Sequence, residues 1–278
     1  MSRRLKDSKC GIVETRYIVS TPVQNEVTIA LISDLHNAVY GSIIKSLEIQ
    51  KPDFIAVNGD LLYASSHGKS IYYENSNAAQ HLRTAPNAVE FLNEATKIGS
   101  VIFSTGNHEL YFDNQDRETL SNLGITFLDN DFVCLDNLVF GGLSSPYKVL
   151  AGTGDAKKRS EHKRRWQLIF KNVKTEWLDE FQNQSGYKIL LSHHPEYYDK
   201  YLKDYKGIDL ILSGHAHGGQ IRIFNKGLYA YGQGLFPKYT HGIYYDRMIV
   251  SGGLSNTSKF PRINNPLELV YILLKPRN

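Results

Sequence analysis

The chain has 278 residues, a formal net charge of +4 and an ordinary globular composition, with 41% hydrophobic and 12% aromatic residues. This composition excludes a disordered polar chain, and no apolar run approaches the roughly 18 residues that a membrane-spanning helix needs. The two cysteines, Cys10 and Cys134, are too few for a disulfide framework.

The net positive charge of the chain arises from one short segment. Residues 157–165 contain six Lys or Arg residues and one Glu, a local excess of five that leaves the rest of the chain near −1. There is therefore no broad basic face of the kind that duplex nucleic acid requires. We expect the segment to form a solvated helix face, a lid over an anionic substrate or a contact with anionic membrane lipid.

The N-terminal residues Met1 to Lys9 carry four basic side chains, including Arg3, Arg4 and Lys6, but no apolar stretch follows them. The sequence therefore predicts no signal peptide. Together with the low cysteine content, this favours a cytoplasmic location with both thiols reduced.

In chain order, the sequence predicts eight short strands that are rich in β-branched and aliphatic residues, at 27–32, 54–57, 101–104, 138–140, 188–191, 210–212, 248–250 and 269–273. Helical patterns occupy 42–50, 87–97 and 174–182, and residues 219–266 are dense in Gly, Tyr and Pro, which favours strands and loops. This order indicates an α/β or α+β layered fold. We predict one domain over residues 1–278, with polar insertions at about 63–86 and 147–171.

Five of the predicted strands run directly into side chains that can bind a metal ion. The five segments end in Asp34 and His36, in Asp60, in Asn107 and His108, in His193 and His194, and in His215 and His217. Binding sites in α/β sheets lie outside the carboxyl ends of strands, so these five ends can meet at one rim. A single Asp after a strand is usually a turn or helix cap, but five such ends together indicate a shared site.

The ligand types indicate which metals this site would take. Mixed imidazole, carboxylate and amide ligands suit Mn²⁺, Fe²⁺ or Zn²⁺ and not a thiolate-type structural zinc site. Seven side chains are candidate ligands, namely Asp34, His36, Asp60, Asn107, His193, His215 and His217. A tetrahedral ion needs four at most, so we predict two divalent ions that share a bridging carboxylate, an arrangement suited to in-line displacement at phosphorus.

These motifs resemble the signature of the calcineurin-like metallophosphoesterases. The resemblance rests on Asp34-x-His36, Gly59-Asp60, Gly106-Asn107-His108-Glu109, His193 and Gly214-His215-x-His217. The stretches Gly214 to Arg222, Tyr231 to Tyr239 and Gly252 to Leu254 resemble more narrowly a bacterial subfamily whose members are often membrane-anchored. The resemblance implies a two-sheet β-sandwich flanked by α-helices, and hydrolysis of phosphomonoesters or phosphodiesters by a metal-bridging hydroxide.

The resemblance also implies a role for each residue. One metal would be bound by Asp34, His36 and His217, the other by Asn107, His193 and His215, with Asp60 bridging the two. His108 would lie near the phosphate, where it would stabilise the developing charge or protonate the leaving oxygen. His194 competes with His193 as a ligand, and the family pattern favours His193. Arg222 and Arg262 are candidates to reach the phosphate, although a salt bridge explains either equally well.

Three features depart from the family pattern. Tyr63 stands where the family often has a second Asp after Gly59-Asp60, the usual Ser-Arg-Gly-Leu-Gly reads Ser251-Gly-Gly-Leu-Ser255, and the apolar N-terminal anchor of the relatives is missing. We expect the bridging carboxylate to keep its role, with altered surroundings and an altered pocket wall.

The expected partner is a phosphate-ester substrate, with no obligate nucleic acid. Three alternatives remain open: a nuclease, a lipid or nucleotide-sugar phosphoesterase, and a non-enzymatic scaffold that holds metal. The sequence does not indicate the oligomeric state.

Overall fold

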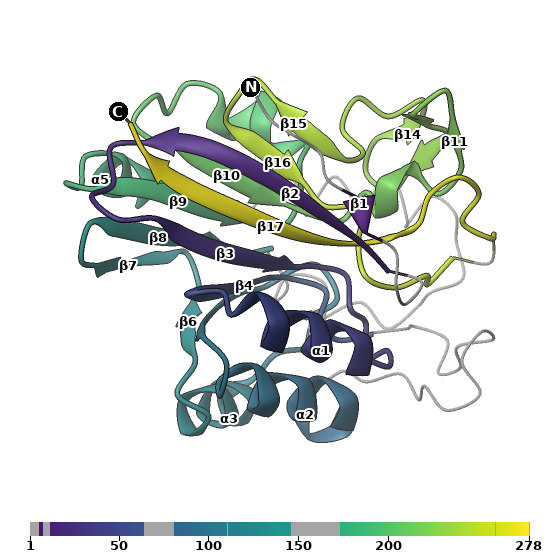
Figure 1. Ribbon diagram of the computed structural model, residues 1–278, viewed down its shortest axis with the longest axis horizontal. Helices are drawn as coiled ribbons and strands as arrows, with labels where there is room; N and C mark the ends of the chain where they lie inside the picture. Colours follow the sequence, from purple (N-terminus) through teal and green to yellow (C-terminus); the bar gives the residue numbers. More distant parts are fainter. Residues whose placement is uncertain are drawn as a thin grey trace.

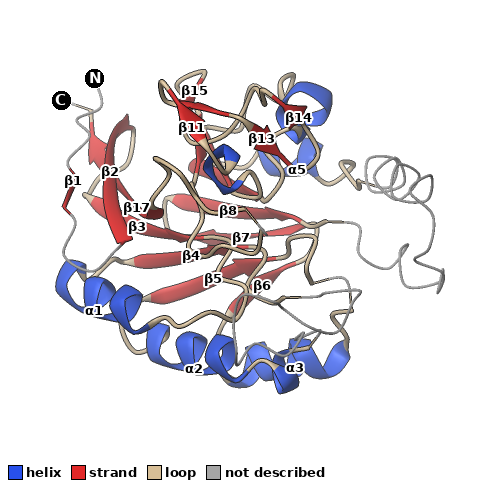
Figure 2. Cartoon of the chain, turned by 90° about the vertical axis from the view of Figure 1, so that its right-hand side faces the viewer, coloured by secondary structure: helices blue, strands red, loops and turns tan. Residues whose placement is uncertain are grey.

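The computed structural model describes residues 6–7, 12–63, 81–109, 111–145, 173–258 and 260–277. Within these residues, two large sheets pack against each other, and three helices lie along the outer side of one of them (Figures 1 and 2). Among the described residues, no helix has both the length and the apolar character needed to cross a membrane. The predicted two-sheet sandwich with flanking helices is confirmed.

The larger sheet has seven strands, in the spatial order β1 (Lys6–Asp7), β2 (Ile12–Thr21), β17 (Leu267–Pro276), β3 (Val27–Ile32), β4 (Phe54–Asn58), β5 (Ser100–Ser104) and β6 (Thr126–Leu128). Strands β3 to β6 run parallel to one another, whereas β17 is antiparallel to β3. The outer helices are α1 (Gly41–Gln50), α2 (Pro86–Ala95) and α3 (Asn114–Asn122) (Figure 2). A short 3₁₀ turn, η1 (Leu82–Thr84), precedes α2.

The second sheet has six strands, in the spatial order β15 (Gly242–Tyr244), β16 (Met248–Val250), β10 (Leu210–Ser213), β9 (Tyr187–Ser192), β8 (Leu138–Leu143) and β7 (Asp131–Leu135). Its four central strands are parallel, and both edge strands are antiparallel to their neighbours. The remaining short elements are α5 (Leu178–Gln182), η3 (Tyr198–Leu202), η4 (His217–Gly219), the hairpin β11 (Arg222–Ile223) with β12 (Lys226–Gly227), and the hairpin β13 (Tyr229–Ala230) with β14 (Gly234–Leu235).

Alternate residues of the central strands enter different apolar layers. In β3, Ile29 and Leu31 pack between the sheets, whereas Ala30 and Ile32 pack toward the helices. A third layer covers the outer face of the second sheet with α5 and η3. Because the central strands are buried on both faces, they appear in the sequence as continuous apolar runs, which is why their positions were predictable.

Elements with a polar or half-exposed sequence escaped prediction. Strand β2 contains Glu14 and Arg16, and α3 buries only Asp116 and Leu120, so neither shows an apolar run. Strands β6 and β7 were also missed, and β15 was predicted only as part of the strands and loops of residues 219–266. The predicted helix 174–182 was too long, because its first residues form a turn in which the amide of Leu178 donates to the carbonyl of Thr175. The basic run 157–165 and residues 64–80 of the first insertion lie outside the described residues.

Candidate metal centre

The carboxyl ends of β3, β4, β5, β9 and β10 meet at one rim that joins the two sheets. The side-chain amide of Asn58, at the end of β4, donates to the carbonyl of Leu212 in β10 at 2.9 Å, which ties one sheet to the other. The carbonyl of Asn58 accepts from Nδ1 of His193, after β9, at 2.8 Å. The parallel direction of these strands, together with these ties, brings the five predicted segments to one place.

Most of the candidate ligands have a backbone conformation that residues other than glycine rarely adopt. The φ angles of Asp34, His36, Asp60, His215 and His217 lie between 44° and 63°, in the left-handed region. Each such residue costs of order 1 kcal/mol relative to an ordinary conformation. Five of them at one rim indicate that these side chains are held for a purpose other than folding.

The first group of candidate ligands consists of Asp34, His36 and His217, whose ligand atoms all lie within 4.8 Å of one another. Nε2 of His217 is 3.4 Å from Oδ1 of Asp34 and 3.4 Å from Nε2 of His36. Nδ1 of His36 lies 3.0 Å from the carbonyl of Leu62, which can only accept, so Nδ1 carries the proton and Nε2 presents its lone pair. This convergence is what a cation with metal–nitrogen distances of about 2.0–2.1 Å requires.

The second group consists of Asp60, His193 and His215, again within 4.8 Å. Nε2 of His193 lies 3.1 Å from Oδ2 of Asp60, and its Nδ1 is used by the carbonyl of Asn58. Oδ1 of Asn107 is buried at the same rim and accepts no hydrogen bond from the described residues. A buried amide oxygen of this kind normally has a partner, and a cation would supply one.

Asp60 lies between the two groups. Its Oδ2 is 3.1 Å from Nε2 of His193 and 3.8 Å from Nε2 of His36, one residue from each group, and its Oδ1 accepts from the amide of His108 at 2.8 Å. Burial alone would raise the pKa of the Asp60 carboxyl, but the imidazoles of His193 and His108 hold that pKa well below its usual value. Asp60 is therefore an ionised carboxylate within reach of both groups.

The imidazoles divide into two electrostatic types. Burial lowers the pKa of His36, His215 and His217, which keeps these rings neutral, as metal ligands must be. His193 is opposite: burial would lower its pKa, but the Asp60 carboxylate raises it to about 10. Without bound cations, a proton between His193 and Asp60 therefore supplies the positive charge that the buried carboxylate needs.

Glu109 is a structural partner of the site. It belongs to the Gly106-Asn107-His108-Glu109 motif, but the motif did not indicate its role. Its buried carboxyl accepts from the backbone amides of Asp60, Leu62 and Gly106 at 2.9, 3.0 and 2.7 Å. Burial and the nearby Asp60 charge raise its pKa to about 7. Gly106 must lack a side chain here, because a Cβ would lie 2.3 Å from Oδ1 of Asp60. Glu109 thus fixes the ends of β4 and β5 around Asp60.

His108 borders the two groups and is partly open to solvent, with its side chain 22% exposed. Its Nε2 lies 3.9 Å from Oδ2 of Asp60, and its ring meets that of His36 edge-on at 4.5 Å. Tyr63, which departs from the family pattern, stacks on His108 with 5.6 Å between ring centroids and 14° between planes. The aromatic ring therefore sets the orientation of His108 by stacking.

His194 faces away from Asp60. Its Nε2 is 2.7 Å from Oγ of Ser145, and its Nδ1 is 3.6 Å from Oε1 of Glu196. The same Oε1 lies 3.9 Å from Nε2 of His215. Ser145, His194 and Glu196 therefore form a polar chain behind His215, and both buried carboxylate oxygens of Glu196 lack a hydrogen bond from the described residues. The sequence offered one signal for this chain, the motif His193-His194-Pro195-Glu196.

The two arginines proposed for substrate binding are engaged with backbone carbonyls. Nε of the buried Arg222 donates to the carbonyl of Gly218 at 3.0 Å. The guanidinium of Arg262 donates to the carbonyls of Gly252, Gly253 and Ser255, and so supports the 251–255 segment that departs from the family pattern. The structure thus gives both side chains a supporting role beside the rim.

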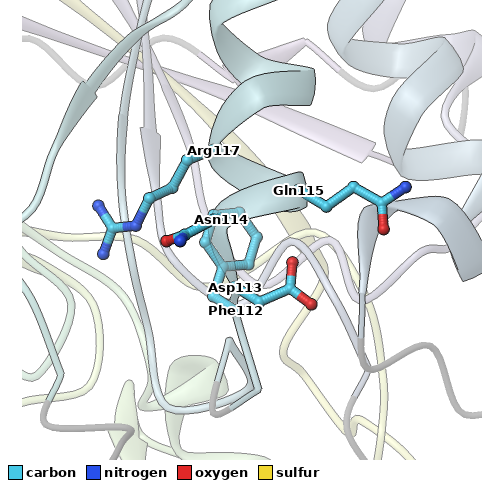
Figure 3. Close-up of a pocket in the computed structure, with 5 residues that line it drawn as sticks. All are labelled: Phe112, Asp113, Asn114, Gln115 and Arg117. Atoms are coloured by element: carbon cyan, nitrogen blue, oxygen red, sulfur yellow. The ribbon is translucent and has the colours of Figure 1, made fainter.

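Two further features lie away from the rim. A surface hollow of about 430 Å³ at the start of α3 is lined by Phe112, Asp113, Asn114, Gln115 and Arg117 (Figure 3). His81, Asp113 and Asp116 cluster nearby, but their contacts serve structure: Asp113 and Asp116 cap α3, and Arg83 pairs with Asp113 at 3.0 Å. Neither feature shares a residue with the candidate metal centre.

Comparisons with known proteins agree with the geometry. The calcineurin-like phosphoesterase family model matches residues 27–219, which contain all seven candidate ligands and His108. An uncharacterised metallophosphoesterase of Helicobacter pylori is 26% identical over 279 residues, covering 94% of this chain and 64% of that protein. A transmembrane protein with a metallophosphoesterase domain from Bos taurus is 26% identical over 216 residues, covering 75% of this chain and 44% of that protein.

Among solved structures, the sulfate thiohydrolase SoxB of Thermus thermophilus superposes with a TM-score of 0.44 at 14% identity, covering 92% of this chain and 57% of that chain. The chain spans just under two thirds of the length of the Helicobacter relative. Because the family model covers more than half of the chain, and the residues within it form the rim described above, the chain belongs to the calcineurin-like phosphoesterase family.

Proposed function

We propose that this protein hydrolyses phosphate esters with two divalent cations held at the rim. Asp34, His36 and His217 hold one cation, and Asn107, His193 and His215 hold the other. Asp60 serves both. The observation that carries the proposal is the convergence of two ligand groups, each within 4.8 Å, on a carboxylate that has an imidazole of each group near one oxygen.

The donor set suits borderline cations. Imidazole nitrogens with carboxylate and amide oxygens favour Mn²⁺, Fe²⁺ or Zn²⁺. Such cations, when bound, lower the pKa of water and neutralise charge on a phosphoryl group. The protein contributes neutral imidazoles, an ionised Asp60 and a rim that excludes most water from these groups, since Asp34, Asp60 and His193 are almost fully buried.

His108 supplies the proton chemistry. Its side chain is more exposed than those of His36, His193 and His217. It lies beside Asp60 on the solvent side. An imidazole there donates a proton to the leaving oxygen or hydrogen-bonds to a phosphoryl oxygen as charge develops. Tyr63 and His36 hold its ring from two sides.

The test combines metal analysis of the purified protein with hydrolysis of nitrophenyl phosphate and bis-nitrophenyl phosphate in Mn²⁺. We expect bound divalent metal and turnover that a chelator abolishes. Asp60→Ala should lower turnover by more than about a hundredfold, because one loss weakens both cation sites. The exposed Asp131→Ala is the matched control. Near-normal hydrolysis by Asp60→Ala would refute the proposal.

A further inference from the structure

Exposed apolar side chains are concentrated in one part of the molecule. Eight of the twelve exposed large hydrophobic residues among the described residues lie within 221–236 and 260–263. We call these two segments the hairpin lobe; they contain β11 to β14 and are joined where the amide of Arg222 donates to the carbonyl of Ile263 at 3.0 Å. Figures 1 and 2 show β11 and β14 grouped at one end of the molecule. Phe224 is 96% exposed and Phe236 is 77% exposed.

Neither packing nor local conformation explains these two phenylalanines. Both have a left-handed backbone, with φ of 49° at Phe224 and 51° at Phe236. Gly and Asn fit this conformation best, and a bulky side chain there is unfavourable. Each phenylalanine therefore has a backbone conformation that disfavours it, and its ring packs into no core. This combination indicates that the rings are displayed for a partner.

The region around the lobe is depleted of acidic residues. Residues 210–267 contain six Lys or Arg residues and only one acidic residue, Asp246, although the whole chain has 28. Lys226 is exposed and pairs with Ile223 in the β11–β12 hairpin, whose turn contains Phe224. The two segments of the lobe contain no acidic residue, and the exposed Lys226 lies among their apolar side chains. Such a surface fits a partner that is apolar inside and anionic at its surface.

The lobe is attached directly to the metal rim. The amide of Leu228 donates to the carbonyl of Gly219, two residues after His217, at 3.0 Å. The backbones approach so closely that a Cβ on Gly219 would lie 2.3 Å from Cα of Gly227. The backbone of Gly232 lies against Glu196 and His215 in the same way. A partner bound by the lobe would therefore lie beside the candidate metal centre.

We infer that the hairpin lobe docks on a bilayer that contains anionic phospholipid. Phe224, Leu235 and Phe236 enter the interface between headgroups and acyl chains, the exposed tyrosines lie at headgroup level, and Lys226 meets lipid phosphates. A single-stranded nucleic acid would need stacking aromatics along a groove, and aliphatic side chains such as Leu235 and Ile223 cannot serve that role. The substrate class then follows from the proposed function, on which this step rests: it is a phosphate ester in a lipid headgroup.

The test is co-sedimentation of the full chain with phosphatidylcholine vesicles, with and without phosphatidylglycerol. We expect binding to the anionic vesicles that weakens with added salt. Phe224→Asn and Phe236→Asn remove the rings while suiting the left-handed backbone, so misfolding does not confound the result. Each should lower partitioning roughly tenfold, as expected for the loss of one inserted phenyl ring. Ile49→Asn, on α1 and 76% exposed, is the control and should bind like the wild type.

Two results would overturn the inference: wild-type protein that stays in solution with both vesicle types, or an equal loss of binding in Ile49→Asn. If vesicle binding is absent and the two Asn variants abolish an affinity for single-stranded DNA or a self-association, that other partner replaces the bilayer. The same samples are assayed with nitrophenyl phosphate. Vesicle binding without hydrolysis would refute the proposed function alone, and hydrolysis without vesicle binding would refute the docking surface alone.

Discussion

The metal rim and the hairpin lobe adjoin each other, yet their side chains are distributed in opposite ways. At the rim, Asp34, Asp60 and His193 are ionisable residues that are at most 1% exposed. In the lobe, Phe224 and Phe236 are apolar residues that are mostly exposed. Both regions also place non-glycine residues in left-handed backbone conformations. Buried ionisable residues, exposed apolar residues and left-handed non-glycine residues are all unfavourable for folding. The two regions are therefore the places where the sequence is not optimal for the fold.

Among the substitutions that test this comparison, the largest effect on turnover is expected for His108, the rim residue that faces solvent. His108→Ala should lower turnover by about 10²- to 10⁴-fold while bound metal stays unchanged, because His108 is not among the proposed ligands. If it protonates the leaving oxygen, the loss should be greater for alkyl phosphates than for nitrophenyl phosphate, whose leaving group needs no proton. An equal loss on both substrates would indicate charge stabilisation instead. A loss of bound metal in His108→Ala would instead indicate that His108 supports a cation, and would contradict its role as proton donor.

Glu196 should have a smaller effect, because it acts through His215. Carboxylates behind a metal-binding histidine typically change metal affinity by about 10- to 100-fold, so Glu196→Gln should weaken the second cation by that amount. Competition with a fluorescent chelator measures this directly and needs no substrate. Glu180→Gln, exposed on α5, is the control. Unchanged affinity in Glu196→Gln would mean that the chain from Ser145 to Glu196 serves only packing.

A proton count tests the two electrostatic types of imidazole. The pKa of His193 is raised from 6.5 to about 10, so at pH 8 it is protonated when no cation is bound, whereas His36, His215 and His217 are neutral. Cation binding at pH 8 should therefore release at least one proton, that of His193, and a second if a bound water ionises. Calorimetry in buffers of different ionisation enthalpy counts it. In the cation-free protein, the raised pKa of His193 contributes stability that is fully present below pH 6.5 and is lost as the pH rises through about 10. The lowered pKa of Asp60 contributes stability that is present above pH 3.8 and is lost at lower pH.

The sequence predicted the rim better than the lobe, for a physical reason. Strands β3, β4, β5, β9 and β10 are continuous apolar runs that end in ligand side chains, so both the strands and their meeting place could be read from the chain. The choice between His193 and His194 depended on resemblance, because adjacent residues differ only in the direction of their side chains. The structure shows that direction: His193 faces Asp60, and His194 faces Ser145.

Other features required three dimensions. Glu109 and Glu196 act through contacts with residues that are distant in sequence or separated by a turn, and no spacing rule indicates such contacts. The exposure of Phe224 and Phe236 was equally hidden, since Phe is among the residue types that are most often fully buried. The sequence could place residues 219–266 in strands and loops, but it could not show which face of them remains uncovered.

The smallest expected effect separates exposed from buried phenylalanine. Phe224→Asn should change the free energy of unfolding by no more than about 0.5 kcal/mol, because the ring packs into no core and Asn suits the local backbone. Phe140→Ala, between the sheets and fully buried against Phe54, should cost about 3–5 kcal/mol. Urea unfolding followed by circular dichroism measures both. A loss of more than 2 kcal/mol in Phe224→Asn, on the scale of a core truncation, would show that the ring supports the fold. The lobe would then not be a region whose exposed apolar side chains have no role in folding.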